Sequence, residues 1–201
     1  AYEHLHDAIK QANPLRNETK EELVFEKGGS ITVSTSFRGG TLQRLHVSEF
    51  GKICAKYPDK AREIVTGAFE AVPLNGKITL ESTAEGRQGY FFDYCQQAEN
   101  DYLAKKDLTA QDWRFFFFAW HNNPDYAMPP EPINERLQAY FDSLEAKHGI
   151  SLTDGQKTWY QAKERTLGDD MKREYPSIPS EAFEQSIEGA YYAKQFTWLY
   201  A

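Results

Sequence analysis

The sequence predicts an α/β fold in which an open, mostly parallel sheet precedes a smaller α-rich C-terminal lobe. Strand-like apolar runs alternate with helical patterns over residues 42–120, which is typical of a parallel sheet with right-handed crossovers. Two asparagines and four prolines then interrupt residues 121–132, and two long helical patterns follow. We therefore expect a sheet domain over residues 1–120 and an α-rich lobe over residues 131–201.

The elements before the sheet are short. Residues 3–11 have a helical pattern that ends at Asn13-Pro14, because the residue before a proline is pushed out of the α region. Two β-rich runs, residues 23–25 and 31–35, flank the glycine turn at residues 27–30, and this arrangement predicts a hairpin.

Three strands are expected in the main sheet. The first covers residues 42–47 and ends at Ser48-Glu49, and the second covers residues 77–83. Between them a helix begins at Pro58, where proline suits the first turn, and apolar residues then recur at helical spacing. After a helix over residues 88–104, the unbroken apolar run 115–120 predicts a strand buried on both faces. Helices over residues 131–147 and 153–167 follow.

Composition limits the function classes. The formal net charge is -7, so a DNA-handling protein of this composition needs a local basic patch or an assembly to hold DNA. No run of about 18 apolar residues predicts a membrane span, and no secretion signal is expected at the N-terminus. Cys54 and Cys95 are the two cysteines, and reduced core-type thiols fit a cytoplasmic protein. The scattered histidines lack partners at ligand spacing, so no metal site is expected from them.

Polar residues end two of the predicted strands abruptly. In open α/β sheets ligands bind outside the carboxyl ends of the strands. We expect the first two strands to be adjacent and parallel, which places Glu49 near Glu81 and near the hydroxyls of Ser82 and Thr83. Glu49 would then take a proton from a water molecule that Ser82 or Thr83 holds. The alternative is that these polar residues simply meet solvent.

Two stretches resemble a known family. Residues 45–98, with the sequence LHVSEFGKICAKYPDKAREIVTGAFEAVPLNGKITLESTAEGRQGYFFDYCQQA, resemble the ATPase domain of the large terminase subunit of tailed phages and prophages. Residues 174–192, with the sequence EYPSIPSEAFEQSIEGAYY, resemble the segment that closes this ATPase region before the nuclease domain. The resemblance implies an incomplete sheet of the P-loop NTPase type that carries an additional catalytic glutamate.

The resemblance also implies roles for individual residues. Glu49 matches the catalytic Walker B glutamate, and Ser48 stands where the family has an aspartate that holds the magnesium shell. Ser82 and Thr83 match the coupling motif, which responds to the γ-phosphate. Arg38 lies where terminases have an arginine that reaches the ATP of a neighbouring subunit, although a solvated loop arginine is an equal alternative.

On this basis the chain is expected to belong to a DNA-packaging motor in the bacterial host cytoplasm. ATP and Mg²⁺ would be its cofactors. Its partners would be double-stranded DNA, the portal protein, the small terminase subunit and further copies of itself in a ring. No membrane association is expected. The 201 residues hold no G-x-x-x-x-G-K-[ST] motif, so the chain is expected to be a fragment that is inactive by itself. A non-catalytic interaction module or a degenerate prophage remnant is the alternative.

Overall fold

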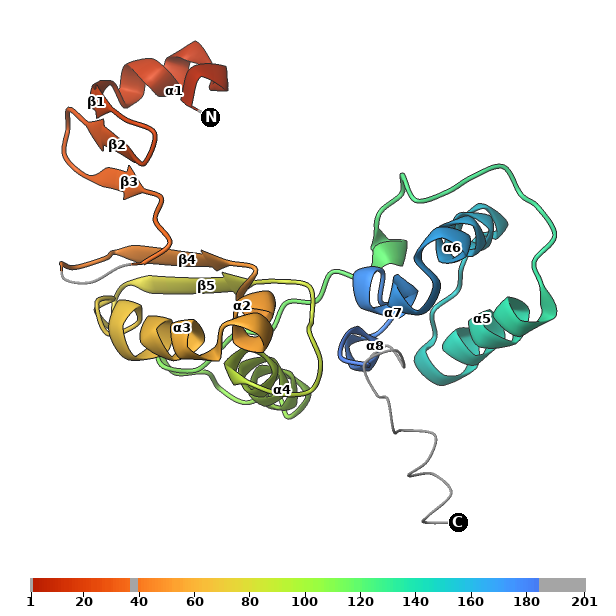
Figure 1. Ribbon diagram of the computed structural model, residues 1–201. Helices are drawn as coiled ribbons and strands as arrows, with labels where there is room; N and C mark the ends of the chain where they lie inside the picture. Colours follow the sequence, from red (N-terminus) through yellow and green to blue (C-terminus); the bar gives the residue numbers. More distant parts are fainter. Residues whose placement is uncertain (1, 37–39, 185–201) are drawn as a thin grey trace. The chain divides into compact units, whose positions relative to one another are not determined.

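The computed structural model describes residues 2–36 and 40–184, and it divides into two compact units, Ala1–Gly40 and Thr41–Ala201. The first unit holds a short helix and an antiparallel sheet, and the second holds a parallel strand pair and most of the helices (Figure 1). The fold is therefore mixed α/β, as the sequence predicts. The expected boundary at residues 121–130 stays a prediction.

The N-terminal unit forms a small three-stranded sheet after the 3-10 helix Tyr2–His4 and helix α1 (Asp7–Ala12). Its strands are antiparallel in the order β1 (Leu15–Glu18), β2 (Glu22–Phe25) and β3 (Ser30–Thr32). The predicted hairpin is confirmed as β2–β3. Its turn uses Gly28 and Gly29 at φ 93° and 88°, a left-handed conformation that suits glycine. Strand β1 was not predicted, because the sequence Leu-Arg-Asn-Glu is largely polar.

The second unit begins with two parallel strands, β4 (Arg44–Ser48) and β5 (Lys77–Glu81). The predicted pairing of these two strands is confirmed. Between them lie α2 (Phe50–Lys56), α3 (Pro58–Glu63) and a π-helical turn (Ile64–Ala68), and α4 (Tyr90–Leu103) follows β5. Figure 1 shows α2, α3 and α4 on one side of the strand pair.

A hydrophobic cluster holds these helices against the strands. Side chains alternate along a strand, so Leu45 and Val47 face the helices while Arg44, His46 and Ser48 are exposed. The buried members of the cluster are Val47, Phe50, Cys54, Ala61 and Phe91. One face of the strand pair is therefore apolar and covered, and the other presents polar side chains.

The predicted strand at residues 115–120 is wrong. This segment belongs to neither sheet, and Phe116 and Phe118 are 68% and 85% exposed, whereas Phe115 and Phe117 are half-buried. The alternating exposure indicates an extended chain with one packed face. In the described part of the molecule no strand pairs with it. The described residues consequently form two small sheets and not an open sheet of the P-loop type.

Helices α5 (Glu135–His148) and α6 (Asp154–Leu167) confirm the two long helical predictions. Asn134 caps α5, and Thr153 forms a capping box with Gln156 at the start of α6. The 3-10 helices Trp120–Asn122 and Gly168–Asp170 and the short helices α7 (Met171–Glu174) and α8 (Pro179–Ala182) complete this part. Among the described residues, no helix is both long and apolar enough to span a bilayer.

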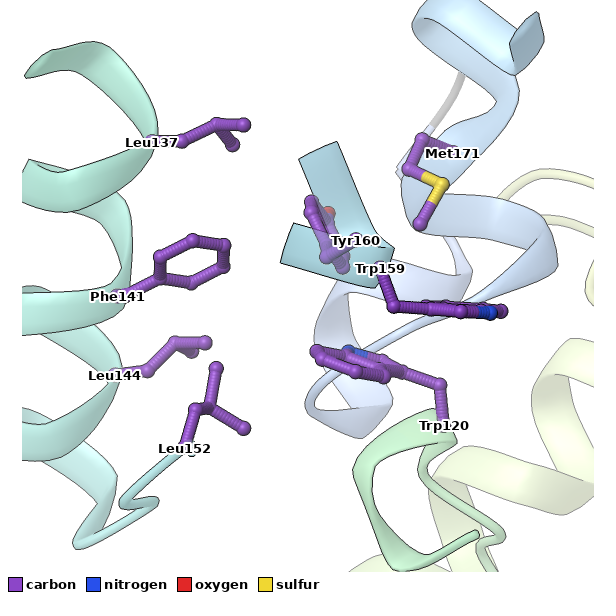
Figure 2. Packing of buried hydrophobic residues seen from close by; sticks show 8 residues of the cluster. All are labelled: Trp120, Leu137, Phe141, Leu144, Leu152, Trp159, Tyr160 and Met171. Atoms are coloured by element: carbon purple, nitrogen blue, oxygen red, sulfur yellow. The ribbon is translucent and has the colours of Figure 1, made fainter. Parts of the chain in front are cut away.

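Aromatic and aliphatic side chains build the second hydrophobic cluster (Figure 2). Trp159 stacks between Trp120 and Tyr126, with ring centroids 5.4 and 4.4 Å away. The buried members are Trp120, Leu137, Phe141, Leu144, Leu152, Trp159, Tyr160 and Met171. Trp159 and Tyr160 therefore serve as packing residues of this cluster.

A polar network closes one edge of this cluster. Trp120 Nε1 donates to Ser177 Oγ at 2.9 Å, and the Tyr140 hydroxyl donates to the buried carboxylate of Glu181 at 2.9 Å. Ser177 N also donates to Glu181 at 2.9 Å. Burial of the Tyr140 hydroxyl raises its pKa far above the usual range, so it remains a donor.

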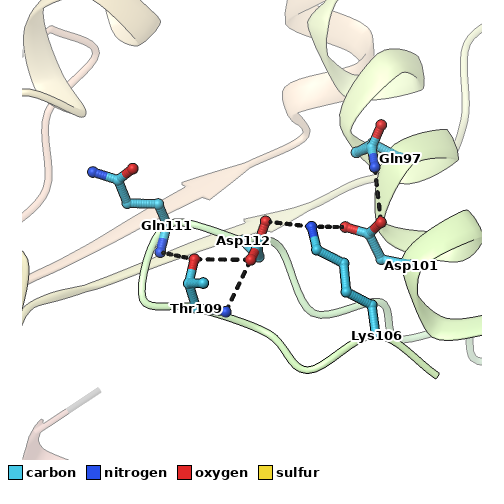
Figure 3. A network of polar contacts seen from close by, with 6 residues as sticks. All are labelled: Gln97, Asp101, Lys106, Thr109, Gln111 and Asp112. Atoms are coloured by element: carbon cyan, nitrogen blue, oxygen red, sulfur yellow. Dashed lines mark hydrogen bonds and ion pairs between the residues drawn. The ribbon is translucent and has the colours of Figure 1, made fainter. Parts of the chain in front are cut away.

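The loop after α4 is tied back by Lys106, as Figure 3 shows. Its Nζ lies 3.1 Å from Asp101 and 2.9 Å from Asp112. Asp112 also accepts the N–H and hydroxyl of Thr109, each at 2.8 Å. The hydrogen bond from Lys106 is the main reason that the pKa of Asp112 falls to about 2. Trp113, the residue after Asp112, stacks on Tyr94 with ring centroids 5.2 Å apart.

Candidate functional site

The carboxyl ends of β4 and β5 meet at one edge, because the strands are parallel and in register from Arg44↔Lys77 to Ser48↔Glu81. The final residue of each strand is therefore opposite the other. Ser48 Oγ donates to Glu81 Oε1 at 2.6 Å, and His46 Nε2 lies 3.7 Å from the same oxygen. This edge gathers the polar strand ends that the sequence predicts.

Glu49 adopts a left-handed backbone conformation, with φ 56° and ψ 34°, between β4 and the first turn of α2. A non-glycine residue held in such a conformation costs about 1–3 kcal/mol. Buried side chains on both sides fix it there, since Val47 and Phe50 belong to the same hydrophobic cluster and Phe50 is 0% exposed. The Glu49 carboxylate itself stays exposed, with Lys52 Nζ at 3.8 Å.

Ser82 and Thr83 lie against the first turn of α2. A Cβ atom on Gly51 would stand 2.8 Å from Thr83 O and 2.9 Å from Ser82 Oγ. Glycine is therefore required for this close approach, which brings Thr83 near the turn that holds Glu49. Ser82 Oγ is buried and has no hydrogen-bond partner among the described residues. Such a group costs about 1–3 kcal/mol, so it is a position where a bound oxygen or N–H would be stabilising.

The structure does not place every residue of the predicted site. Arg38 lies outside the described residues, so its role as a trans-acting arginine stays a prediction. The roles of Glu49, Ser48, Ser82 and Thr83 in catalysis and nucleotide binding also stay predictions, although the strand pairing brings Ser48 and Glu81 together. Glu81 was not predicted to take part in nucleotide or magnesium binding, because the pairing register that places it opposite Ser48 is not fixed by the lengths of the two strands.

Two neighbouring basic residues of the C-terminal lobe, Lys172 and Arg173, lie beside acidic side chains. Arg173 lies 3.2 Å from Asp170 and 3.1 Å from Glu174, and Lys172 lies 3.2 Å from Glu184. Such pairs between exposed side chains are typical of a solvated, charge-balanced surface.

Neither cysteine is poised for nucleophilic chemistry. Burial raises the pKa of the Cys54 thiol and raises that of Cys95 to about 12, so both thiols are protonated at neutral pH. No group of three metal-ligating side chains occurs among the residues that the structure describes. The chain matches no known protein family, no curated protein and no solved structure.

Proposed function

We propose that the chain is part of the ATP-hydrolysing motor of a large terminase, which packages viral DNA into procapsids. The observation that carries this proposal is the backbone of Glu49. A strained, exposed glutamate stands at the carboxyl end of β4, beside the end of a parallel neighbour. Strained residues of this kind cluster at active sites, where the strain is part of the mechanism.

In the proposed reaction Glu49 acts as the general base. Its exposed carboxylate takes a proton from the water molecule that attacks the γ-phosphate. Lys52 Nζ lies 3.8 Å from this carboxylate. The unsatisfied hydroxyl of Ser82 and the neighbouring Thr83 follow β5, and they would respond to the phosphate and transmit its loss to α2 through Gly51.

The strand-end residues fit a cation that keeps most of its water. Magnesium prefers oxygen ligands and is usually held by one or two protein groups together with phosphates and waters. Ser48 and Glu81 offer a hydroxyl and a carboxylate at the correct edge, whereas the described residues hold no all-protein cage. When bound, magnesium would neutralise charge on the nucleotide phosphates.

The remaining parts of the motor are proposed on the same basis. A strand that carries a phosphate-binding loop would complete the parallel sheet, since β5 has β4 as its single partner in the described residues. Double-stranded DNA, the portal protein and the small terminase subunit would be the partners of a homo-oligomeric ring in the bacterial cytoplasm. Arg38 would act across the interface between neighbouring copies.

The test is Glu49→Gln in an ATPase that carries this chain together with a phosphate-binding loop. The amide keeps the shape of the side chain and cannot accept the proton, so turnover should fall about a hundredfold or more while nucleotide affinity stays unchanged. Glu70→Gln is the matched control, because Glu70 is also exposed, and its neighbour Ala71 accepts a hydrogen bond from Leu42, ahead of β4 and away from the carboxyl ends of the strands. Near-normal hydrolysis by Glu49→Gln would show that another residue acts as the general base.

A further inference from the structure

Ser48 and Glu81 form a direct pair on the open face of the β4–β5 sheet. They are opposite each other in register, and both lie on the face that α2 and α4 leave uncovered. The Ser48 hydroxyl donates to Glu81 Oε1 at 2.6 Å. This distance is within the short range of charge-assisted O–H···O⁻ bonds, which are stronger than bonds between neutral groups.

The pair changes what a serine can do at this position. Because its proton is directed to Glu81, the Ser48 oxygen turns its lone pairs away from the carboxylate. The Glu81 carboxylate places a full negative charge within hydrogen-bonding distance of the Ser48 oxygen. A neutral hydroxyl is a poor partner for a divalent cation by itself, whereas a hydroxyl backed by a carboxylate is electron-rich.

We propose that Ser48 and Glu81 act as one unit in holding a hydrated divalent cation, with Glu81 supplying the charge that a serine lacks. The inference rests on the proposed function, because it assumes that this edge faces a nucleotide-bound cation. Glu81 is then a positioning residue that acts through Ser48, on the strand next to the one that carries Glu49.

The backbone positions of the two carboxylates favour Glu81 over Glu49 for this role. Glu49 lies beside Lys52 and follows β4 in a left-handed turn, whereas Glu81 belongs to the strand and faces His46 at 3.7 Å. The side chain of Glu81 is also 52% exposed, so a hydrated ion has access to it.

The probe is Mn²⁺ alone, added to the ¹⁵N-labelled 201-residue chain, because a bound paramagnetic ion broadens the amide signals near it. Millimolar Mn²⁺ should broaden the signals of Ser48 and Glu81. Glu81→Gln should require about tenfold more Mn²⁺ or more for the same broadening, as is typical when an outer-shell partner of a metal is removed. The control Glu70→Gln should leave the broadening unchanged.

A charge swap distinguishes this role from simple packing. In Ser48→Asp/Glu81→Gln the carboxylate moves to the neighbouring strand and the pair stays intact, so the broadening should return. A structural role for Glu81 would give no such rescue. Should Glu81→Gln fail to fold, Glu81→Asp keeps the charge but withdraws it by one methylene, and the broadening should weaken.

Three results would overturn the inference: no broadening at Ser48 and Glu81 in the unaltered chain, full broadening in Glu81→Gln, or a folded charge-swap variant without rescue. None of them concerns the base, because the Glu49→Gln turnover assay decides that role independently. If Glu49 is essential for turnover and Glu81 is dispensable, the proposed function therefore stands and this inference is wrong.

Discussion

The contact between Gly51 and the segment after β5 allows a quantitative prediction. Gly51→Ala adds one methyl group, which would stand 2.8 Å from Thr83 O, 2.9 Å from Ser82 Oγ and 3.0 Å from Phe91 Cδ1. The first of these atoms belongs to the backbone, and Phe91 is part of the buried cluster. The methyl group has no flexible surface side chain to displace, so either α2 or the chain after β5 has to move.

Two opposing effects set the magnitude. Overpacking of a well-packed site costs about 1–3 kcal/mol. Alanine is better than glycine in a helix by about 1 kcal/mol, and this gain is smaller in the first turn, where Gly51 lies. The overpacking prevails, and we expect Gly51→Ala to lower the free energy of unfolding by about 1–2 kcal/mol.

Urea denaturation followed by circular dichroism measures this change, with Gly67→Ala as the matched control. Gly67 is also helical, but a Cβ there would meet nothing within 4 Å, so alanine should be neutral or stabilising by up to about 1 kcal/mol. Equal or higher stability of Gly51→Ala relative to Gly67→Ala would refute the close approach. The Ser82–Thr83 segment would then not be positioned by α2.

Two further predictions concern the polar networks. Tyr140→Phe removes the hydroxyl that bonds the buried Glu181 carboxylate, and it should cost about 1–3 kcal/mol in urea unfolding, whereas Tyr102→Phe at a 68% exposed side chain should cost almost nothing. Equal effects of the two would contradict a role for the network. The lowered pKa of Asp112, about 2 against 3.8, adds stability above about pH 4 that is lost as the pH falls toward 2. Asp112→Asn should therefore flatten the dependence of the urea midpoint on pH between 4 and 2, and an unchanged slope would argue against the Lys106 contact.

The elements with local signals were predictable from the sequence. Pro58 begins α3 at its first position, and Thr153 caps α6, because each residue satisfies or avoids a backbone donor of the first turn. The adjacency of β4 and β5 followed from two apolar runs that end in polar residues. Each of these signals is carried by a short stretch of residues, so it can be found in a single sequence.

The remaining features depend on contacts across the chain. The run at residues 115–120 is apolar enough for a buried strand, but a strand needs a partner for its backbone, and hydrophobicity does not supply one. The bond from Ser48 to Glu81 depends on register, which strand lengths alone left open by one or two residues. The left-handed backbone of Glu49 gave no signal, because glycine or asparagine would be expected there.

At position 49, selection for folding stability and selection for activity would favour different residues, because the backbone there is left-handed. Glycine occupies a left-handed conformation without steric cost, so position 49 is a place where the best residue for folding differs from the one present. A library screened for cell abundance alone should enrich glycine at position 49, and one screened for the proposed ATPase activity should retain glutamate. The substitution spectrum of this single residue would thus report whether a population of such chains is still under selection for chemistry or only for persistence.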